Sequence, residues 1–247
     1  MRDTVMRDTP AGGGPGGRED SPVDTIGLRN ALLFRGLDDE AAGALSASLA
    51  ETKIRRGEVL FSEGDEGDRL YIVTEGKVKL GRTSSDGREN LLAILGPGQM
   101  FGELSLFDPG PRSATVTAVT DCTMQSLSHD ELGQWLDGRP EVARGLLTQL
   151  AGRLRRANDV VADLVFSDVP GRVAKALLDL SSRFGRVADD GVHVHHDLTQ
   201  EELAQLVGAS RETVNKALAD FASRGWLRLE ARSVVLMDVE RLKRRAR

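Results

Sequence analysis

The feature that most constrains the fold is the stretch 141–166, whose apolar side chains recur every three or four residues. The recurring positions are Ala143, Leu147, Leu150, Leu154, Ala157, Val161 and Leu164. Spacings that alternate between four and three form the a/d seam of a heptad repeat, which predicts a helix packed along a partner helix. No proline interrupts the stretch, and Pro140 stands just before it, where proline suits a helix N-terminus. The helix should span about 39 Å.

Two interpretations of this helix are open. It is either an amphipathic helix packed on its own domain or a rod on the two-fold axis of a dimer. Small alanines at two seam positions allow a twin helix to approach closely. We favour the homodimer, because the segments before and after the helix have the patterns of separate domains.

Composition limits the class of protein. A chain of 247 residues with 40% hydrophobic residues has room for one large or two small domains. No apolar run approaches the length of a membrane span, and the acidic N-terminus has no apolar segment typical of a signal peptide. Cys122 is the single cysteine, so no internal disulfide is expected. Together these features predict a cytoplasmic protein without a membrane partner.

Net charge alone argues weakly against a nucleic-acid partner, since the formal charge is −5. The distribution is more informative. From Ser167 to the end the chain carries 14 basic and 12 acidic residues, so the negative charge lies in the preceding part. The basic excess comes from the last seven residues.

The chain divides into four segments. Residues 1–24 are polar and rich in Gly and Pro, and we expect them to be disordered. Residues 25–140 begin with a short helical pattern around Leu28, Leu32, Leu33, Leu37, Leu45 and Leu49. Short apolar runs punctuated by glycine follow, which predicts an all-β barrel or sandwich with hairpin turns at Glu75-Gly76 and Asp86-Gly87. The helix 141–166 comes third, and residues 167–247 form the fourth segment.

The pattern of the fourth segment is helical again. Thr199 and Glu202 form a capping box at the start of one helix, which ends at Gly208, and Ser210 caps the next. Two capped helices joined by a short glycine turn predict a helix-turn-helix. The runs 226–230 and 233–237 predict a following hairpin, the wing of a winged helix.

A candidate ligand site lies between strands, in the run FGELSLFDPGPRSATV at 101–116. Gly102 and the residues after it offer backbone N–H groups to an anion, and Arg112 offers a planar bidentate donor to a phosphate. Glu103 can accept a hydrogen bond from a sugar hydroxyl. Together these groups suit a nucleotide with a compact phosphate. The alternative is that Glu103 and Arg112 merely form an ion pair that closes a loop.

The run G-E-L-S-L-F-x-x-G-x-R-S resembles the phosphate-binding cassette of cyclic nucleotide-binding domains. Together with the order β-roll, long helix and winged helix, it resembles the cyclic AMP receptor protein family, actinobacterial branch, over about residues 26–247. The resemblance implies an α+β fold: an N-terminal cyclic nucleotide-binding β-roll of jelly-roll type, a dimerisation helix and a C-terminal winged helix-turn-helix. It implies cyclic AMP as the effector and double-stranded DNA and RNA polymerase as partners.

The resemblance also implies which residues bind the nucleotide. Glu103 matches the ribose acceptor, Arg112 and Ser113 match the phosphate ligands, and backbone amides near Gly102 and Ser105 assist. Ala157 stands where the family usually has threonine, and Asn158 keeps a polar group beside it. The full candidate set is Leu80, Leu92, Gly102, Glu103, Leu104, Ser105, Arg112, Ser113, Ala157 and Asn158.

Most of the candidate DNA-contacting residues lie at the start of the second helix of the helix-turn-helix. N-terminal residues of such a helix face base edges in the major groove, where Arg suits guanine and Glu suits cytosine. Thr199 and Gln200 lie at the start of the first helix and, with Ser210, are candidate phosphate contacts. The set is Thr199, Gln200, Ser210, Arg211, Glu212, Thr213, Asn215 and Lys216. The alternative is a charged helix face that contacts only solvent.

No pattern indicates an enzyme or a metal site. No set of residues has the arrangement of a catalytic triad, and the alternating His193, His195 and His196 lack the cysteines or carboxylates of a metal framework. We therefore expect a homodimeric transcription regulator that responds to cyclic AMP and binds palindromic TGTGA-like sites. The alternatives are a ligand-independent or weakly coupled regulator of the same fold, which Ala157 favours, and a cyclic-nucleotide-regulated enzyme or adaptor.

Overall fold

The computed structural model describes residues 37, 39–108, 110–137 and 139–247. The predicted disordered segment 1–24 and the helical pattern at Leu28, Leu32 and Leu33 lie outside the described residues. Helix α2 (Asp39–Ser48) opens the described chain and buries Ala42 and Leu45.

The first part of the fold is a β-roll of two four-stranded antiparallel sheets, as the family resemblance implies, and the glycine-punctuated apolar runs form its short strands. One sheet has the order β1-β8-β3-β6 and the other β2-β7-β4-β5. The strands are β1 (Ala50–Ile54), β2 (Val59–Phe61), β3 (Arg69–Glu75), β4 (Val78–Thr83), β5 (Glu89–Leu95), β6 (Met100–Phe101), β7 (Thr115–Ala118) and β8 (Cys122–Ser128), with α3 (Leu104–Phe107) between β6 and β7.

One of the two predicted hairpin turns is confirmed. Strands β4 and β5 pair with Thr83 opposite Glu89, so Asp86-Gly87 closes a hairpin, and Gly87 has the positive φ of 80° that such a turn favours. The hairpin at Glu75-Gly76 is wrong, because β3 and β4 belong to different sheets. That turn instead carries the chain from one sheet to the other.

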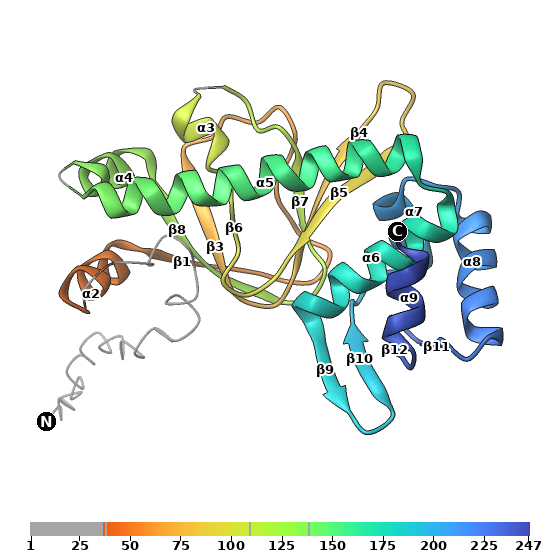
Figure 1. Ribbon diagram of the computed structural model, residues 1–247. Helices are drawn as coiled ribbons and strands as arrows, with labels where there is room; N and C mark the ends of the chain where they lie inside the picture. Colours follow the sequence, from red (N-terminus) through yellow and green to blue (C-terminus); the bar gives the residue numbers. More distant parts are fainter. Residues whose placement is uncertain (1–36, 38, 109, 138) are drawn as a thin grey trace, which may run out of the picture.

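Two helices cover the end of the roll beside α2. Helix α4 (His129–Leu136) begins at a capping box of Ser128 and Glu131, and α5 (Pro140–Phe166) follows it. Buried side chains of α2, α4 and α5 pack against one sheet, among them Leu45, Leu132 and Leu146. The α5 helix is the long rod that Figure 1 shows running along the roll to the C-terminal part.

Helix α5 presents two different faces. Its buried residues are Val142, Gly145, Leu146 and Gln149, a stripe that lies against the roll. The heptad seam is another stripe, where Leu147, Leu154, Val161 and Leu164 are 65%, 64%, 63% and 52% exposed. These four seam side chains are therefore largely uncovered in the single chain, while Ala143 and Leu150 of the seam are half-buried.

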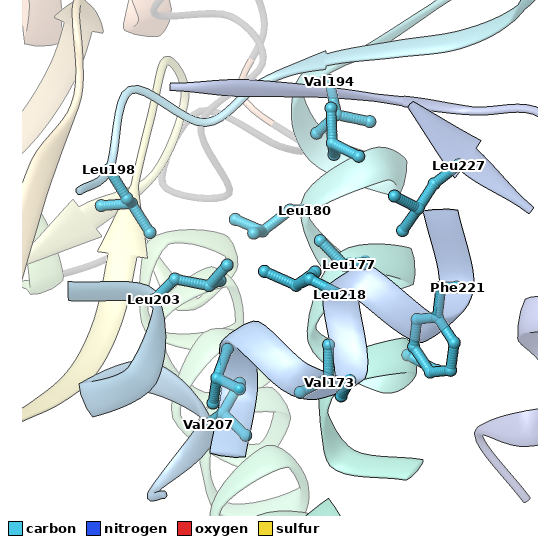
Figure 2. Packing of buried hydrophobic residues seen from close by; sticks show 14 of the residues in the cluster. Val173, Leu177, Leu180, Val194, Leu198, Leu203, Val207, Leu218, Phe221 and Leu227 are labelled. Atoms are coloured by element: carbon cyan, nitrogen blue, oxygen red, sulfur yellow. The ribbon is translucent and has the colours of Figure 1, made fainter. Parts of the chain in front are cut away.

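The C-terminal part is a winged helix-turn-helix, with α7 and α8 as the helix-turn-helix and β11 and β12 as the wing. The elements are α6 (Val169–Phe184), β9 (Gly185–Ala188), β10 (Gly191–His195), α7 (Gln200–Val207), α8 (Arg211–Ser223), β11 (Leu227–Glu230), β12 (Ser233–Leu236) and α9 (Val239–Arg245). The strands form one sheet of order β11-β12-β10-β9. Figure 2 shows its apolar core, where Leu177 and Leu180 of α6 face Leu203 of α7 and Leu218 of α8.

The helix-turn-helix also contacts the roll of the same chain. Leu91, Ile94 and Val119 of the roll belong to the apolar cluster of the C-terminal part. Lys79 Nζ lies 2.5 Å from Glu202 Oε1, which joins β4 to α7. The observed fold is thus α+β as expected, with the two parts in direct contact.

Candidate functional site

The loop between β6 and α3 forms one wall of the candidate ligand site. Gly102 has a φ of 82°, and a Cβ there would lie 2.8 Å from Arg112 Nη1. Glycine is therefore required both by the backbone and by the close approach of the guanidinium. The Ser105 hydroxyl donates to the Gly102 carbonyl oxygen at 3.2 Å. These contacts hold the loop closed around the side chain of Arg112.

Arg112 is a buried cation with little negative charge near it. The residue is 5% exposed, and its Nη1 donates to the Gly102 carbonyl oxygen at 3.0 Å and to Ser105 Oγ at 3.2 Å. Its contact with Asp68 is 3.9 Å long, and the Asp68 side chain is 71% exposed. The Arg112 Nε is buried without a hydrogen-bond partner. Burial lowers the pKa of the guanidinium, which neighbouring Tyr71 and Asp68 partly oppose.

Glu103 pairs with Arg153, not with Arg112, so the loop-closing ion pair of the sequence-based alternative does not form. Arg153 Nη1 lies 2.6 Å from Glu103 Oε1, and Arg153 also donates to the Met100 carbonyl oxygen. Burial lowers the pKa of Arg153, and Glu103 acts in the opposite direction. The other oxygen, Glu103 Oε2, is buried without a partner. It is a free acceptor on a residue that lines the same pocket as Arg112.

Arg153 is not among the residues predicted from sequence. It follows Val142, Leu146 and Gln149 at helical spacing, on the face of α5 that lies against the roll. This second stripe is the sequence feature that could have identified Arg153. It is harder to recognise than the heptad seam beside it, because the spacing of the seam is more regular.

These groups surround one pocket, whose lining includes Phe61, Leu80, Gly102, Glu103, Leu104, Ser105, Arg112, Ser113 and Arg153. Three of the predicted nucleotide-contacting residues are elsewhere. Leu92 is 49% exposed on β5 and does not line the pocket. Ala157 and Asn158 are exposed on α5, about one turn beyond Arg153. Phe61 and Arg153 also line the pocket, from outside the run 101–116, and the sequence did not single them out.

The helix-turn-helix presents the predicted DNA-contacting side chains together. Thr199 caps α7 with Glu202 in the predicted box, Gly208 ends α7 with a φ of 69°, and Ser210 caps α8. Arg211, Glu212, Thr213 and Lys216 are exposed, as are Thr199 and Gln200, while Asn215 is half-buried. The Gln200 amide oxygen accepts from Asn215 Nδ2 at 3.2 Å and from Arg211 Nη2 at 3.5 Å. The start of α7 is thereby tied to the start of α8.

The histidines of the β10 region have structural contacts. His193 Nε2 lies 2.6 Å from Asp190 Oδ1, and His196 Nδ1 accepts from the Leu198 N–H at 3.1 Å. Burial lowers the pKa of His196 to about 4. Across the described part of the chain, no group of His, Cys, Asp and Glu side chains has the arrangement of a metal site.

Comparison with known proteins identifies both parts. Residues 51–139 match the cyclic nucleotide-binding domain, and residues 171–245 match the Crp-like helix-turn-helix domain. A CRP-like cAMP-activated global transcriptional regulator of Mycobacterium tuberculosis is 57% identical over 220 residues, which cover 89% of this chain and 98% of that protein. The chain belongs to the cyclic AMP receptor protein family.

Further relatives agree with this family. The cyclic AMP receptor protein of Thermus thermophilus is 37% identical over 216 residues, 85% of this chain and 97% of that protein. The solved structure of FixK2 from Bradyrhizobium japonicum superposes with a TM-score of 0.71 at 27% identity, covering 79% of this chain and 96% of that one. Members of the cyclic AMP receptor protein family are transcription regulators with a DNA-binding helix-turn-helix and are not enzymes. None of the described helices combines the length and apolar character needed to cross a membrane.

Proposed function

We propose that this chain is a homodimeric, cyclic-AMP-responsive transcription regulator that binds palindromic TGTGA-like sites in the cytoplasm. The observation that carries the proposal is the buried guanidinium of Arg112, which faces a pocket with little negative charge to balance it. A cyclic phosphate would supply the missing anion, and Glu103 Oε2 would accept a ribose hydroxyl. The relatives named as cAMP-activated support the choice of nucleotide.

In this proposal each of the four segments has its own role: 1–24 is an N-terminal tail, 25–140 binds the nucleotide, 141–166 forms the dimer and 167–247 binds DNA. The exposed heptad seam of α5 joins two copies, which would place Ala157 and Asn158 of each copy beside the partner subunit. Two copies present two α8 helices related by a two-fold axis, and such helices bind half-sites about 34 Å apart. The promoter-bound dimer would then contact RNA polymerase.

Cyclic AMP strengthens DNA binding only if it prefers the conformer in which the two α8 helices match that spacing. The direct contact between α7 and the roll offers a route for this preference, because the nucleotide pocket and the helix-turn-helix share one packed body. The proposal therefore predicts that cyclic AMP raises affinity for a palindromic site.

The second candidate is a regulator of the same fold that binds DNA without cyclic AMP or responds to it weakly. Ala157 favours this candidate, because alanine has no hydroxyl to offer the base. Fluorescence-anisotropy titration of a labelled TGTGA palindrome with and without cyclic AMP distinguishes the two. A tenfold or greater gain supports the responsive regulator, and an unchanged tight affinity supports the second candidate. Weak binding under both conditions contradicts both.

A further inference from the structure

The guanidinium of Arg112 rests on aromatic rings. Its Cζ lies 4.2 Å from the centroid of the Phe61 ring and 5.9 Å from that of Tyr71. The rings of Phe61, Tyr71 and Phe101 contact one another, with centroids 5.4–6.0 Å apart. A cation over a ring face is attracted by the quadrupole of the ring without receiving a full negative charge. We call Phe61 and Tyr71 the aromatic platform.

Two glycines leave room for the guanidinium beside the platform. A Cβ at Gly67 would lie 3.1 Å from Arg112 Cζ and 2.2 Å from Ser105 Oγ, and a Cβ at Gly102 would lie 2.8 Å from Arg112 Nη1. Any side chain at either position would displace Arg112 or Ser105. The guanidinium therefore occupies a narrow space between the aromatic platform and the backbone of the two glycines.

From this geometry we propose that Phe61 is a positioning residue for anion binding by Arg112. The Phe61 ring stabilises the buried cation and fixes its plane, a role that a carboxylate usually fills in a protein interior. A carboxylate at this position would neutralise Arg112 and compete with a phosphate for its N–H groups. An aromatic ring leaves the charge and the N–H groups available to the ligand.

The backbone of β2 supports this role. Phe61 is the last residue of β2, and the pairing of β2 with β7 shifts register between Val59 and Phe61. Such an irregularity re-aims a side chain relative to a regular strand. Phe61 is partly buried and lines the pocket, so its ring lies between the strand and the ligand site.

The test rests on the proposed function, so calorimetry first measures cyclic AMP binding by the wild-type protein. Phe61→Leu should weaken that binding about 3- to 30-fold, and Phe61→Tyr, which keeps the ring, should stay within about twofold. Phe107→Leu is the matched control. Phe107 is the last residue of α3, which follows the Gly102–Glu103 loop, and its side chain is 46% exposed and does not line the pocket. It should bind like wild type.

Two further measurements separate positioning from general packing. An Arg112→Lys background keeps a cation but has no planar guanidinium to orient, so Phe61→Leu should cost less affinity there than in the wild-type background. Apo Phe61→Leu loses the ring contacts with Arg112, Tyr71 and Phe101, so it should melt a few degrees below Phe61→Tyr but remain folded. The inference is overturned if Phe61→Leu binds cyclic AMP normally, or if it loses as much affinity in the Arg112→Lys background as in the wild-type background. A wild-type protein that does not bind cyclic AMP would refute the proposed function, and this inference with it.

Discussion

Arg153 of the long helix α5 reaches Glu103 of the ligand loop, with Nη1 and Oε1 only 2.6 Å apart. Glu103 is fully buried, while the Arg153 side chain is 26% exposed. The pair thus links the helix that carries the heptad seam to the loop that holds Arg112. A nucleotide that contacts Glu103 would therefore act directly on α5 through the Glu103–Arg153 ion pair.

Loss of Arg153 should destabilise the protein, because it leaves the Glu103 carboxylate buried without its partner. We expect Arg153→Met to lower the free energy of unfolding by about 2–4 kcal/mol, measured by urea titration. Arg155→Met is the control, since Arg155 is exposed on the same helix. The double variant Glu103→Gln/Arg153→Met should recover at least half of the loss. Equal stabilities of wild type and Arg153→Met would show that the pair contributes nothing.

Loss of Arg112 should abolish ligand binding but have little effect on the stability of the ligand-free protein. Arg112→Leu removes a buried cation whose ion pair with Asp68 is long, at 3.9 Å, and exposed on the Asp68 side, so the apo melting temperature should change by only a few degrees. Cyclic AMP binding, followed by calorimetry, should fall below detection, because the charge-assisted phosphate contact is gone. Retained binding together with a large loss of apo stability would assign Arg112 a structural role instead.

The dimer should depend on the exposed seam of α5. Leu154 is 64% exposed in the single chain, so Leu154→Asp should fold normally but place a charge in the interface. A buried unpaired charge costs several kcal/mol, and we expect monomers at micromolar concentration in analytical ultracentrifugation. Thr148→Asp is the control, because Thr148 is exposed on α5 outside the heptad seam. Dimers of Leu154→Asp would mean that the two-fold axis lies elsewhere.

Local and repeating patterns account for what the sequence predicted well. The uninterrupted seam predicts α5 to within one residue, and the capping residues predict where α7 and α8 begin. The predicted hairpin at Glu75-Gly76 is wrong because a turn that joins two sheets uses the same residue types as a hairpin turn. The Arg153–Glu103 pair joins residues 50 positions apart, and nothing in either local sequence specifies that contact.

His196 should make stability depend on pH. The buried imidazole has a pKa of about 4, well below the ordinary value of 6.5, because burial disfavours its charged form. Asp197 and Glu202 face it and raise the pKa, while Lys77 and His195 lower it. The unfolded chain therefore binds a proton more readily, so stability is lost as pH falls from about 6.5 to about 4.

The expected loss attributable to His196 across this window is about 2–3 kcal/mol. His196→Asn keeps an acceptor for the Leu198 N–H but has no titrating group, so its free energy of unfolding should fall less over the same pH range. Urea titrations of both proteins at several pH values provide the comparison. Parallel curves for the two proteins would show that His196 does not contribute.

The α8 helix should contact bases through Arg211. Arg211 is exposed at the first position of α8, beside the Ser210 cap, and lies near Gln200 of α7. A bidentate contact from arginine to guanine discriminates against other bases by about 1–3 kcal/mol. Arg211→Ala should therefore lose about 5- to 150-fold in affinity for a matched palindrome. The loss on scrambled DNA should be much smaller, because that binding depends on phosphate contacts and salt.

Arg224→Ala is the matched control for this comparison. Arg224 follows the last residue of α8, is exposed, and pairs with Asp220 at 2.9 Å, so it lies at the opposite end of the helix from the predicted base contacts. Its removal should leave the preference for the matched site unchanged. Gel-shift titrations at one fixed salt concentration, with saturating cyclic AMP, compare the three proteins on matched and scrambled sites. If Arg211→Ala lowers the affinity for matched and scrambled DNA equally, Arg211 contacts only the phosphate backbone. Base recognition must then come from Glu212 or Lys216, whose side chains pair with each other at 2.6 Å in the free protein.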